Sequence, residues 1–382
     1  MYELYQQFLK TLQRDGKYRK LTCTCQAGNS ELLDFSTNDY LNLSRHGSLI
    51  NEGMVVARAQ GFGSTGSRLL SGNSDLYEEF ESLIAKDKNS EAGLIFNSGF
   101  QANISTLSCL LDQKILNAKP LVFFDRLNHA SLYQAVFLSS AQLCRYRHND
   151  MNHLEFLLSR YKNESRPKFI VTETVFGMDG DIAPIEHIAE LTFAYNAFLY
   201  LDEAHATGVF GKNGYGLSTS VDLRNIPHVV MGTFSKALGA SGGYVACHNI
   251  IRDFLINNSK GFIYSTALSP PVIGAAFCAW QLVESFDKER EILRNLGKSL
   301  RRILMDNGFD IGSSQTHIVP VILHEESACL RIKELLADRG IIVSCIRPPT
   351  VPPGTARLRI ALTAKHRLSD LERLVTALKE VF

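Results

Sequence analysis

The sequence predicts an α/β fold: a large domain with a mostly parallel, helix-covered sheet, followed by a smaller α+β domain. Two observations predict it. From about residue 90, short apolar runs alternate with helical patterns, and this alternation is typical of parallel sheets buried on both faces. After about residue 275 a long helical stretch leads into further strand patterns and a final helix, which indicates a second unit.

The elements follow in chain order. An amphipathic helix pattern at about 3–14 precedes a polar segment and a short strand near 32–36, and a second helix is predicted at 49–60. The strand patterns of the large sheet lie at 92–96, 121–125, 168–175, 197–202 and 228–234, with helical patterns at 130–138 and 185–195. Later strand patterns lie at 316–323, 341–346 and 358–363. We therefore expect an N-terminal helix and arm (1–50), a large domain (51–275) and a small α+β domain (276–382).

The composition is that of an ordinary globular protein: 382 residues, 45% hydrophobic and 21% charged. No apolar run approaches the length of a membrane span, and the first residues lack the pattern of a signal peptide. The eight cysteines are scattered, and the one close pair, Cys23 and Cys25, has the spacing of neither a zinc knuckle nor a redox motif. These features predict a cytoplasmic protein with free thiols, no membrane segment and no metal site.

Residues 202–205 read D-E-A-H, letters familiar from helicases. A helicase also needs a phosphate-binding loop upstream. The only G-K-[ST] match is Gly297-Lys298-Ser299, which lies downstream and within a helical pattern. The formal net charge is +1, without the basic stripe that binds nucleic acid. The sequence therefore argues against a nucleic-acid partner.

A second pattern, G-x-G-x-x-G at 61–66, resembles a dinucleotide fingerprint. That fingerprint must follow a strand and open a helix. Here the preceding residues pattern as a helix and the following ones as a loop. A nicotinamide cofactor is therefore disfavoured, and the glycines indicate a loop that runs close to another part of the protein.

Polar residues follow three of the predicted strands: Asp202 and His205, then Thr233, Ser235 and Lys236, and also Asp125 with His129. Ligands in open α/β sheets bind beyond the carboxyl ends of the strands. One crevice at this edge is therefore expected to hold an aspartate, two histidines and a lysine.

This set fits the chemistry of pyridoxal 5'-phosphate (PLP). A desolvated lysine such as Lys236 forms Schiff bases with aldehydes. PLP is an aldehyde that needs a carboxylate at its ring nitrogen, which Asp202 can provide. Its phosphate needs donors, and Gly99 and Phe100 open a predicted helix whose N–H groups can supply them. The alternative, a structural turn lysine and a helix-capping aspartate, explains each residue alone but not the set.

Ordered motifs along nearly the whole chain resemble the α-oxoamine synthases, a branch of the fold-type-I PLP-dependent transferases. They are N-D-Y-L at 38–41, G-S-T-G-S-R at 63–68, S-G-F-Q-A-N at 98–103, D-x-x-N-H-A-S at 125–131, M-D-G-D at 178–181, D-E-A-H-A-T-G at 202–208, G-T-F-S-K-A-L-G at 232–239 and Y-S-T-A-L at 264–268. The resemblance implies an enzyme that condenses an amino acid with an acyl thioester and releases CO₂.

The segment R-P-P-T-V-P-P-G-T-A-R-L-R at 347–359 is most similar to members that join L-alanine to a pimeloyl thioester in biotin synthesis. Coenzyme A and an acyl carrier protein both stay open as the thiol carrier. The alternatives are relatives that use glycine with acetyl or succinyl donors or serine with long-chain donors, and a non-catalytic partner subunit. The last alternative should lack Lys236 or Asp202, and both are present.

The resemblance implies cofactor roles position by position. Lys236 would bond to the cofactor aldehyde and later take the α-proton, and His129 would stack on the cofactor ring. Asp202 would pair with the ring nitrogen and His205 with the phenolic oxygen. The implied phosphate ligands are Gly99, Phe100, Thr233 and, from one subunit of a homodimer to the other, Thr266.

On the substrate side, the resemblance implies that Arg359 pairs with the amino-acid carboxylate and that Arg19 and Thr350 line the acyl-donor side. There are departures from the family pattern. Gly177 stands where the family usually has a serine that helps to hold the phenolic oxygen, so a role for Gly177 is in doubt. Tyr77 replaces a common histidine and Asn42 a usual glycine; His317 is given no role.

Overall fold

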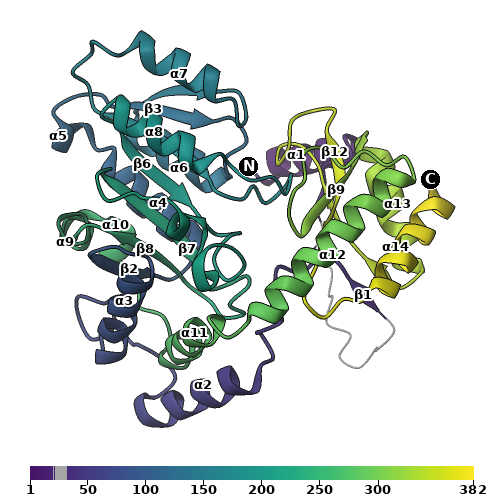
Figure 1. Cartoon of the computed structure of the whole chain (residues 1–382), viewed down its shortest axis with the longest axis horizontal. Coiled ribbons are helices and arrows are strands. Elements are labelled where there is room, and N and C mark those ends of the chain that lie inside the picture. The colour runs from purple at the N-terminus through teal and green to yellow at the C-terminus, as the bar shows by residue number, and fades with distance from the viewer. Residues whose placement is uncertain (20, 22–31) are drawn as a thin grey trace. The chain divides into compact units, whose positions relative to one another are not determined.

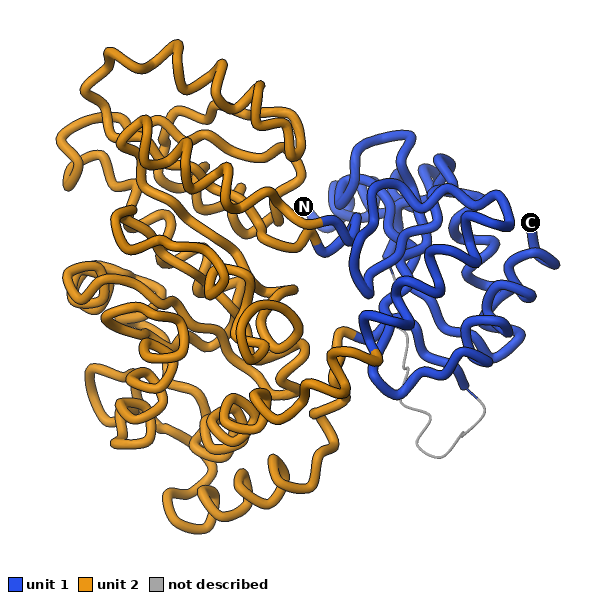
Figure 2. Tube along the Cα trace, in the orientation of Figure 1, with its two compact units in different colours: residues 1–37, 177–181, 293–382 blue, residues 38–176, 182–292 orange. Residues whose placement is uncertain are grey.

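The computed structural model describes residues 1–19, 21 and 32–382. Cys23 and Cys25 lie outside the described residues. The chain divides into two compact units, coloured separately in Figure 2. The large unit comprises 38–176 and 182–292, and the small unit comprises 1–37, 177–181 and 293–382. The domain division at residues 50 and 275 stays a prediction.

A seven-stranded sheet forms the centre of the large unit (Figure 1). Its order is β2 (Ala92–Phe96), β8 (Gly243–Cys247), β7 (His228–Thr233), β6 (Phe198–Asp202), β5 (Lys168–Glu173), β3 (Leu121–Asp125) and β4 (Gln142–Tyr146). Strand β8 is antiparallel to β2 and β7, and the other pairs are parallel. The predicted mostly parallel sheet is confirmed; the sequence patterns missed β4 and β8.

Helices cover both faces of this sheet. On one face lie α4 (Gly99–Leu110), α6 (Ala130–Ser139), α9 (Asn249–Asn258) and α10 (Lys260–Ile263), and on the other α7 (Met151–Arg160) and α8 (Ile185–Ala194). Along β3, Val122 and Phe124 join the first core while Leu121 and Phe123 join the second. Because successive side chains of a strand point to opposite faces, a strand covered on both sides reads as a continuous apolar run.

Three further helices belong to the large unit, together with the short α5 (Gln113–Leu116) and two 3-10 helices, η1 (Lys212–Gly214) and η2 (Leu217–Ser220). Helix α3 (Asp75–Asp87) packs on β2, and α11 (Pro270–Val283) packs against α2 (Gly47–Gln60). Trp280 of α11 is fully buried among Phe80, Phe234 and Tyr244. Phe234 stands two residues before Lys236, so this cluster packs against the start of the segment that carries the lysine.

The small unit contains a three-stranded antiparallel sheet in the order β11 (Ser344–Ile346), β12 (Ala356–Ala361) and β9 (Ile318–His324), and a parallel pair, β1 (Leu33–Asp34) with β10 (Ile341–Ile342). Its helices are α1 (Tyr2–Arg14), α13 (Glu326–Asp338) and α14 (Leu368–Val381). Helix α12 (Asp287–Asp306) begins in the large unit and continues into the small one. It contains the G-K-S match, which is therefore part of a helix.

The segment 177–181 packs within the small unit although its neighbours in sequence belong to the large one. Gly180 has φ +72°, and a Cβ there would lie 1.8 Å from the Ile318 carbonyl oxygen. Only glycine fits such a left-handed position against backbone. The glycine of M-D-G-D thus lets this segment run along β9.

Within residues 1–19, 21 and 32–382, no helix has both the length and the apolar character needed to cross a membrane. The same residues contain no group of three histidine, cysteine or acidic side chains arranged to hold a metal ion.

Candidate active site

Strands β6 and β7 are parallel neighbours, so the residues that follow them meet at one edge of the sheet. Lys236 Nζ lies 2.7 Å from His205 Nε2. His205 Nδ1 lies 2.7 Å from the hydroxyl of Tyr40, which donates to Asn38 Oδ1 at 3.1 Å. Tyr40 and His205 are both buried. A continuous polar chain therefore runs from the lysine through the histidine to the N-D-Y-L motif.

Asp202 is the last residue of β6 and is buried. The backbone N–H of Ala204 donates to Asp202 Oδ1 at 2.9 Å, and Asn103 Nδ2 donates to Oδ2 at 2.7 Å. Asn103 comes from α4, four residues after Gly99, so one helix contributes both. Two donors hold the carboxylate in a fixed orientation, which a partner for a ring nitrogen requires.

His129 stands at the N-cap of α6, where its Nδ1 lies 2.7 Å from Ser131 Oγ and accepts from the Ser131 backbone N–H at 3.3 Å. The ring of Phe100 meets that of His129 edge-on, with centroids 6.4 Å apart. Phe100 and His129 are both exposed, so the face of the imidazole is accessible to a ligand.

Helix α4 begins beside the turn that follows β7. Ser98 caps it by accepting from the Gln101 N–H at 3.1 Å, and a Cβ on Gly99 would lie 3.3 Å from Thr233 Cβ. Thr233 Oγ1 donates to the Gly242 carbonyl at 2.7 Å and lies 2.8 Å from Ser235 Oγ. The first N–H groups of α4 are the kind of donors that bind an anion at a helix N-terminus, and the Thr233 hydroxyl, engaged here with the Gly242 carbonyl, lies beside them.

Thr266, the residue expected to reach a second subunit, is exposed. Its carbonyl oxygen accepts from Asn97 Nδ2 at 2.6 Å, and its backbone bridges to Ser67. The loop that carries Thr266 is thereby tied to the residues just before the α4 N-terminus.

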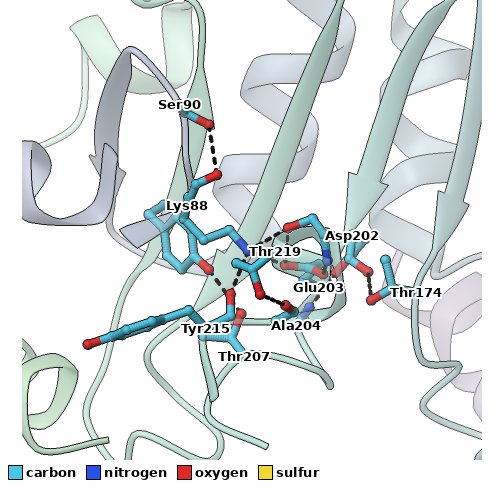
Figure 3. Close-up of polar contacts among 12 residues, drawn as sticks. Lys88, Ser90, Thr174, Asp202, Glu203, Ala204, Thr207, Tyr215 and Thr219 are labelled. Atoms are coloured by element: carbon cyan, nitrogen blue, oxygen red, sulfur yellow. Dashed lines mark hydrogen bonds and ion pairs between the residues drawn. The ribbon is translucent and has the colours of Figure 1, made fainter. Parts of the chain in front are cut away.

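Lys88 and Glu203, the residue that follows Asp202, form a buried ion pair (Figure 3). Lys88 Nζ contacts the carboxylate of Glu203 and donates to the Tyr215 carbonyl at 2.7 Å and to Ser218 Oγ at 2.8 Å. Both side chains of the pair are fully buried. Burial lowers the pKa of Lys88, and the charge of Glu203 opposes that shift. Since Glu203 directly follows Asp202, the pair anchors the turn between Asp202 and His205.

In the small unit the structure shows where Arg359, Arg19 and Thr350 lie. Arg359 is buried on β12, and its Nε donates to the Gly177 carbonyl at 2.5 Å. Arg19 and Thr350 are exposed, and Arg19 Nη2 donates to Thr350 Oγ1 at 3.3 Å. Gly177, which stands where the family usually has a serine, thus contacts Arg359 through its backbone carbonyl.

His317, which received no role from the sequence, is buried close to Arg359 and Arg301. Burial, with a smaller contribution from the two guanidinium charges, lowers its pKa to about 3. His317 is therefore neutral at physiological pH.

Asp125, placed in the crevice by sequence, stabilises its own loop. Its carboxylate accepts from the backbone N–H groups of Leu127 and Asn149, each at 2.9 Å, and lies 2.9 Å from His148 Nδ1.

Sequence reasoning assigned no role to Tyr40, Asn103, Ser131 or Lys88. Tyr40 and Asn103 both stand inside motifs quoted above, and the spacing of Gly99 and Asn103 is one helical turn. That spacing puts Asn103 on the same face of the helix as Gly99, and it was the sequence feature that could have indicated a role for Asn103. No local pattern pointed to Lys88, whose partner lies 115 residues away.

A family model described as aminotransferase class I and II matches residues 30–378. The chain belongs to this family. Among relatives, it is 43% identical to an 8-amino-7-oxononanoate synthase of Gluconacetobacter diazotrophicus, over 97% of this chain and 92% of that protein.

Two solved structures share the fold of this chain. An 8-amino-7-oxononanoate synthase of Francisella tularensis has a TM-score of 0.77 and 29% identity, covering 92% of this chain and 98% of that one. A serine palmitoyltransferase of S. paucimobilis with bound PLP–myriocin has a TM-score of 0.90 and 25% identity, covering 100% and 97%. The predicted fold and the resemblance to α-oxoamine synthases are confirmed.

Proposed function

We propose that this chain is a PLP-dependent acyltransferase that condenses L-alanine with a pimeloyl thioester and releases CO₂, giving 8-amino-7-oxononanoate for biotin synthesis. The observation that carries the proposal is the contact of Lys236 with His205, 2.7 Å from Nζ to Nε2, at the sheet edge where Asp202 ends β6. The similarity to an 8-amino-7-oxononanoate synthase over nearly the whole chain supports this choice of substrates.

The donor set fits PLP. Asp202, held by two N–H donors, matches a ring nitrogen that must keep its proton. The α4 N-terminus at Gly99 and Phe100 matches a phosphate, and Thr233 would donate to it once its hydroxyl turns from the Gly242 carbonyl. His205 supplies a ring nitrogen for the phenolic oxygen, and the exposed imidazole of His129 offers a flat surface for the ring.

Bound here, PLP would supply an aldehyde for the amino group and an electron-poor ring that stabilises negative charge at the α-carbon. Lys236 would take the α-proton on Nζ as a general base. His205, which Tyr40 orients, lies against that nitrogen. Asp202 would keep a proton on the ring nitrogen, because its carboxylate is the buried negative charge at that end of β6.

In the small unit, Arg359 would bind the alanine carboxylate, since a guanidinium matches a carboxylate in two hydrogen bonds. Arg19 and Thr350, which hydrogen-bond each other, would contact the acyl donor. The new bond joins the alanine α-carbon to the thioester carbonyl carbon. The thiol of coenzyme A or of an acyl carrier protein leaves, and the alanine carboxylate departs as CO₂.

The proposal includes a cytoplasmic homodimer in which Thr266 contributes to the partner's phosphate site. Exposure of Thr266 beside Asn97 supports it. Sedimentation should give a dimer at working concentration, and a Thr266→Ala chain should bind PLP more weakly. A fully active monomer would contradict the shared site.

Substrate choice is tested by steady-state kinetics on purified protein loaded with PLP. Alanine, glycine and serine are each paired with acetyl, succinyl, pimeloyl and palmitoyl thioesters. The proposal predicts the highest kcat/KM for alanine with the pimeloyl donor. If glycine with acetyl or succinyl donors is tenfold better, about 1.4 kcal/mol in transition-state free energy, the chain is a different α-oxoamine synthase. No turnover with any pair would favour a non-catalytic subunit.

A further inference from the structure

A buried hydrogen-bond chain connects the two residues expected to hold the cofactor ring. Asn103 Nδ2 donates both to Asp202 Oδ2 at 2.7 Å and to Ser131 Oγ at 2.9 Å. Ser131 Oγ lies 2.7 Å from His129 Nδ1. Asn103 and Ser131 are both buried, so solvent does not compete for these contacts.

The residues at the two ends of this hydrogen-bond series, Asp202 and His129, determine which group donates in each bond. The carboxylate of Asp202 only accepts, so the Asn103 amide must turn its nitrogen toward it. The amide oxygen then faces Tyr200, whose hydroxyl donates to Asn103 Oδ1 at 2.9 Å. Both N–H bonds of the amide are used, and the reversed orientation would leave oxygen against oxygen.

Ser131 receives one of the Asn103 N–H groups, so its own hydroxyl hydrogen is available for His129. His129 Nδ1 also faces the backbone N–H of Ser131 at 3.3 Å. Two donors therefore converge on Nδ1, which must accept. A proton on Nδ1 would point at both of them, and the neutral imidazole carries its proton on Nε2.

We propose that Asn103 and Ser131 are positioning residues that couple Asp202 to His129 and hold His129 in the neutral form protonated on Nε2. The inference rests on the proposed function, in which Asp202 and His129 contact one ring. A ring whose nitrogen keeps its proton against the Asp202 carboxylate bears positive charge, and an imidazolium stacked on it would be repelled. The Asn103 amide thus orients the Asp202 carboxylate that accepts from the ring nitrogen. Through the Ser131 hydroxyl, the same amide keeps His129 uncharged.

The first test needs no substrate. Full-length protein labelled with ¹⁵N-histidine is compared by NMR as wild type and as Ser131→Ala, with assignment by a His129→Gln variant. The wild type should show the His129 proton on Nε2 and a hydrogen-bonded, unprotonated Nδ1. Ser131→Ala should shift the Nδ1 signal and populate the other tautomer. A wild-type proton on Nδ1 overturns the proposal.

The second test measures PLP affinity of the cofactor-free protein by titration. Ser131→Ala and Asn103→Ala should raise Kd, the latter by about tenfold or more, because it removes a hydrogen bond to a charged group. The matched control is Thr106→Val, one turn along α4. Thr106 is fully buried, and among the described residues its hydroxyl has no hydrogen-bond partner, so Kd should change little.

The double variant Asn103→Ala/Ser131→Ala should be no worse than Asn103→Ala alone, because both act on one chain of contacts. Additive effects, or equal effects from all three sites including Thr106, would mean that only helix packing was disturbed. Ser131→Ala removes a single oxygen and keeps the test valid if Asn103→Ala fails to fold. If the NMR and Kd results hold but alanine and pimeloyl donors give no product, the proposed function fails and the inference stands.

Discussion

Replacing Lys88 by methionine is predicted to destabilise the protein severely. Methionine keeps most of the apolar stem but removes the ammonium that contacts Glu203, the Tyr215 carbonyl and Ser218 Oγ. Glu203 then stays fully buried, and within the described part of the chain only the backbone N–H and the hydroxyl of Ser218 still donate to it, at 2.7 and 3.0 Å. Removing one partner of a buried ion pair costs about 3–5 kcal/mol, because the other charge is left uncompensated.

Urea unfolding followed by tryptophan fluorescence measures this cost. Trp280 is the only tryptophan in the sequence, and it stacks on Tyr215 with centroids 5.0 Å apart. The probe therefore lies next to the residue whose carbonyl Lys88 contacts. The midpoint should fall while the slope with denaturant stays constant. PLP affinity should fall too, because Glu203 belongs to the turn between Asp202 and His205.

Two further variants separate charge from packing. Lys88→Met/Glu203→Gln removes the buried charge while keeping an acceptor for the Ser218 N–H, so it should recover much of the loss. Arg224→Met breaks a solvent-exposed pair with Asp222 and should change stability little. The reasoning is refuted if Lys88→Met is no worse than Arg224→Met, or if the double variant is no better than Lys88→Met.

Three other outcomes are expected. Lys236→Ala should abolish turnover while PLP still binds without a borohydride-stable bond to the chain; measurable product formation would exclude Lys236 as the base. Arg359→Lys should raise the KM for alanine about tenfold or more, because lysine cannot make the paired contact; an unchanged KM would remove Arg359 from the carboxylate site. His317 has a pKa near 3 when folded, against about 6.5 unfolded. Below pH 6.5 the unfolded chain binds a proton that the native state does not. As the pH falls below 6.5, this group should therefore lower the unfolding free energy, with a slope that approaches about 1.4 kcal/mol per pH unit. His317→Asn should lose that slope between pH 6.5 and 5.5, and equal slopes would contradict a neutral buried histidine.

The elements that the sequence predicted are those whose local pattern reflects their burial. Strand β3 reads L-V-F-F-D because both its faces are covered. Strand β4 was missed because it is an edge strand whose sequence Q-L-C-R-Y includes polar and exposed positions. Strand β8 is as long as β3, and it was missed because it begins with Gly243 in a glycine-rich stretch.

The residues of the candidate site also divide into those that a local sequence pattern predicted and those that it did not. Asp202 ends one recognisable strand, and His205 and Lys236 come shortly after the ends of recognisable strands, so their meeting at one edge could be predicted. The contact of Tyr40 with His205 spans 165 residues, and that of Asn103 with Asp202 spans 99. Such contacts depend on how loops and helices pack over the sheet, which no local pattern in one sequence encodes.

The most direct test of the proposed chemistry uses L-alanine labelled with ¹³C in its carboxylate, together with a pimeloyl thioester and the PLP-loaded protein. The account predicts that the label leaves entirely as CO₂, with equal amounts of free thiol and unlabelled 8-amino-7-oxononanoate. The alternative reaction is transamination, in which alanine is converted to pyruvate with its carboxylate intact. Labelled pyruvate without labelled CO₂ would contradict decarboxylative condensation.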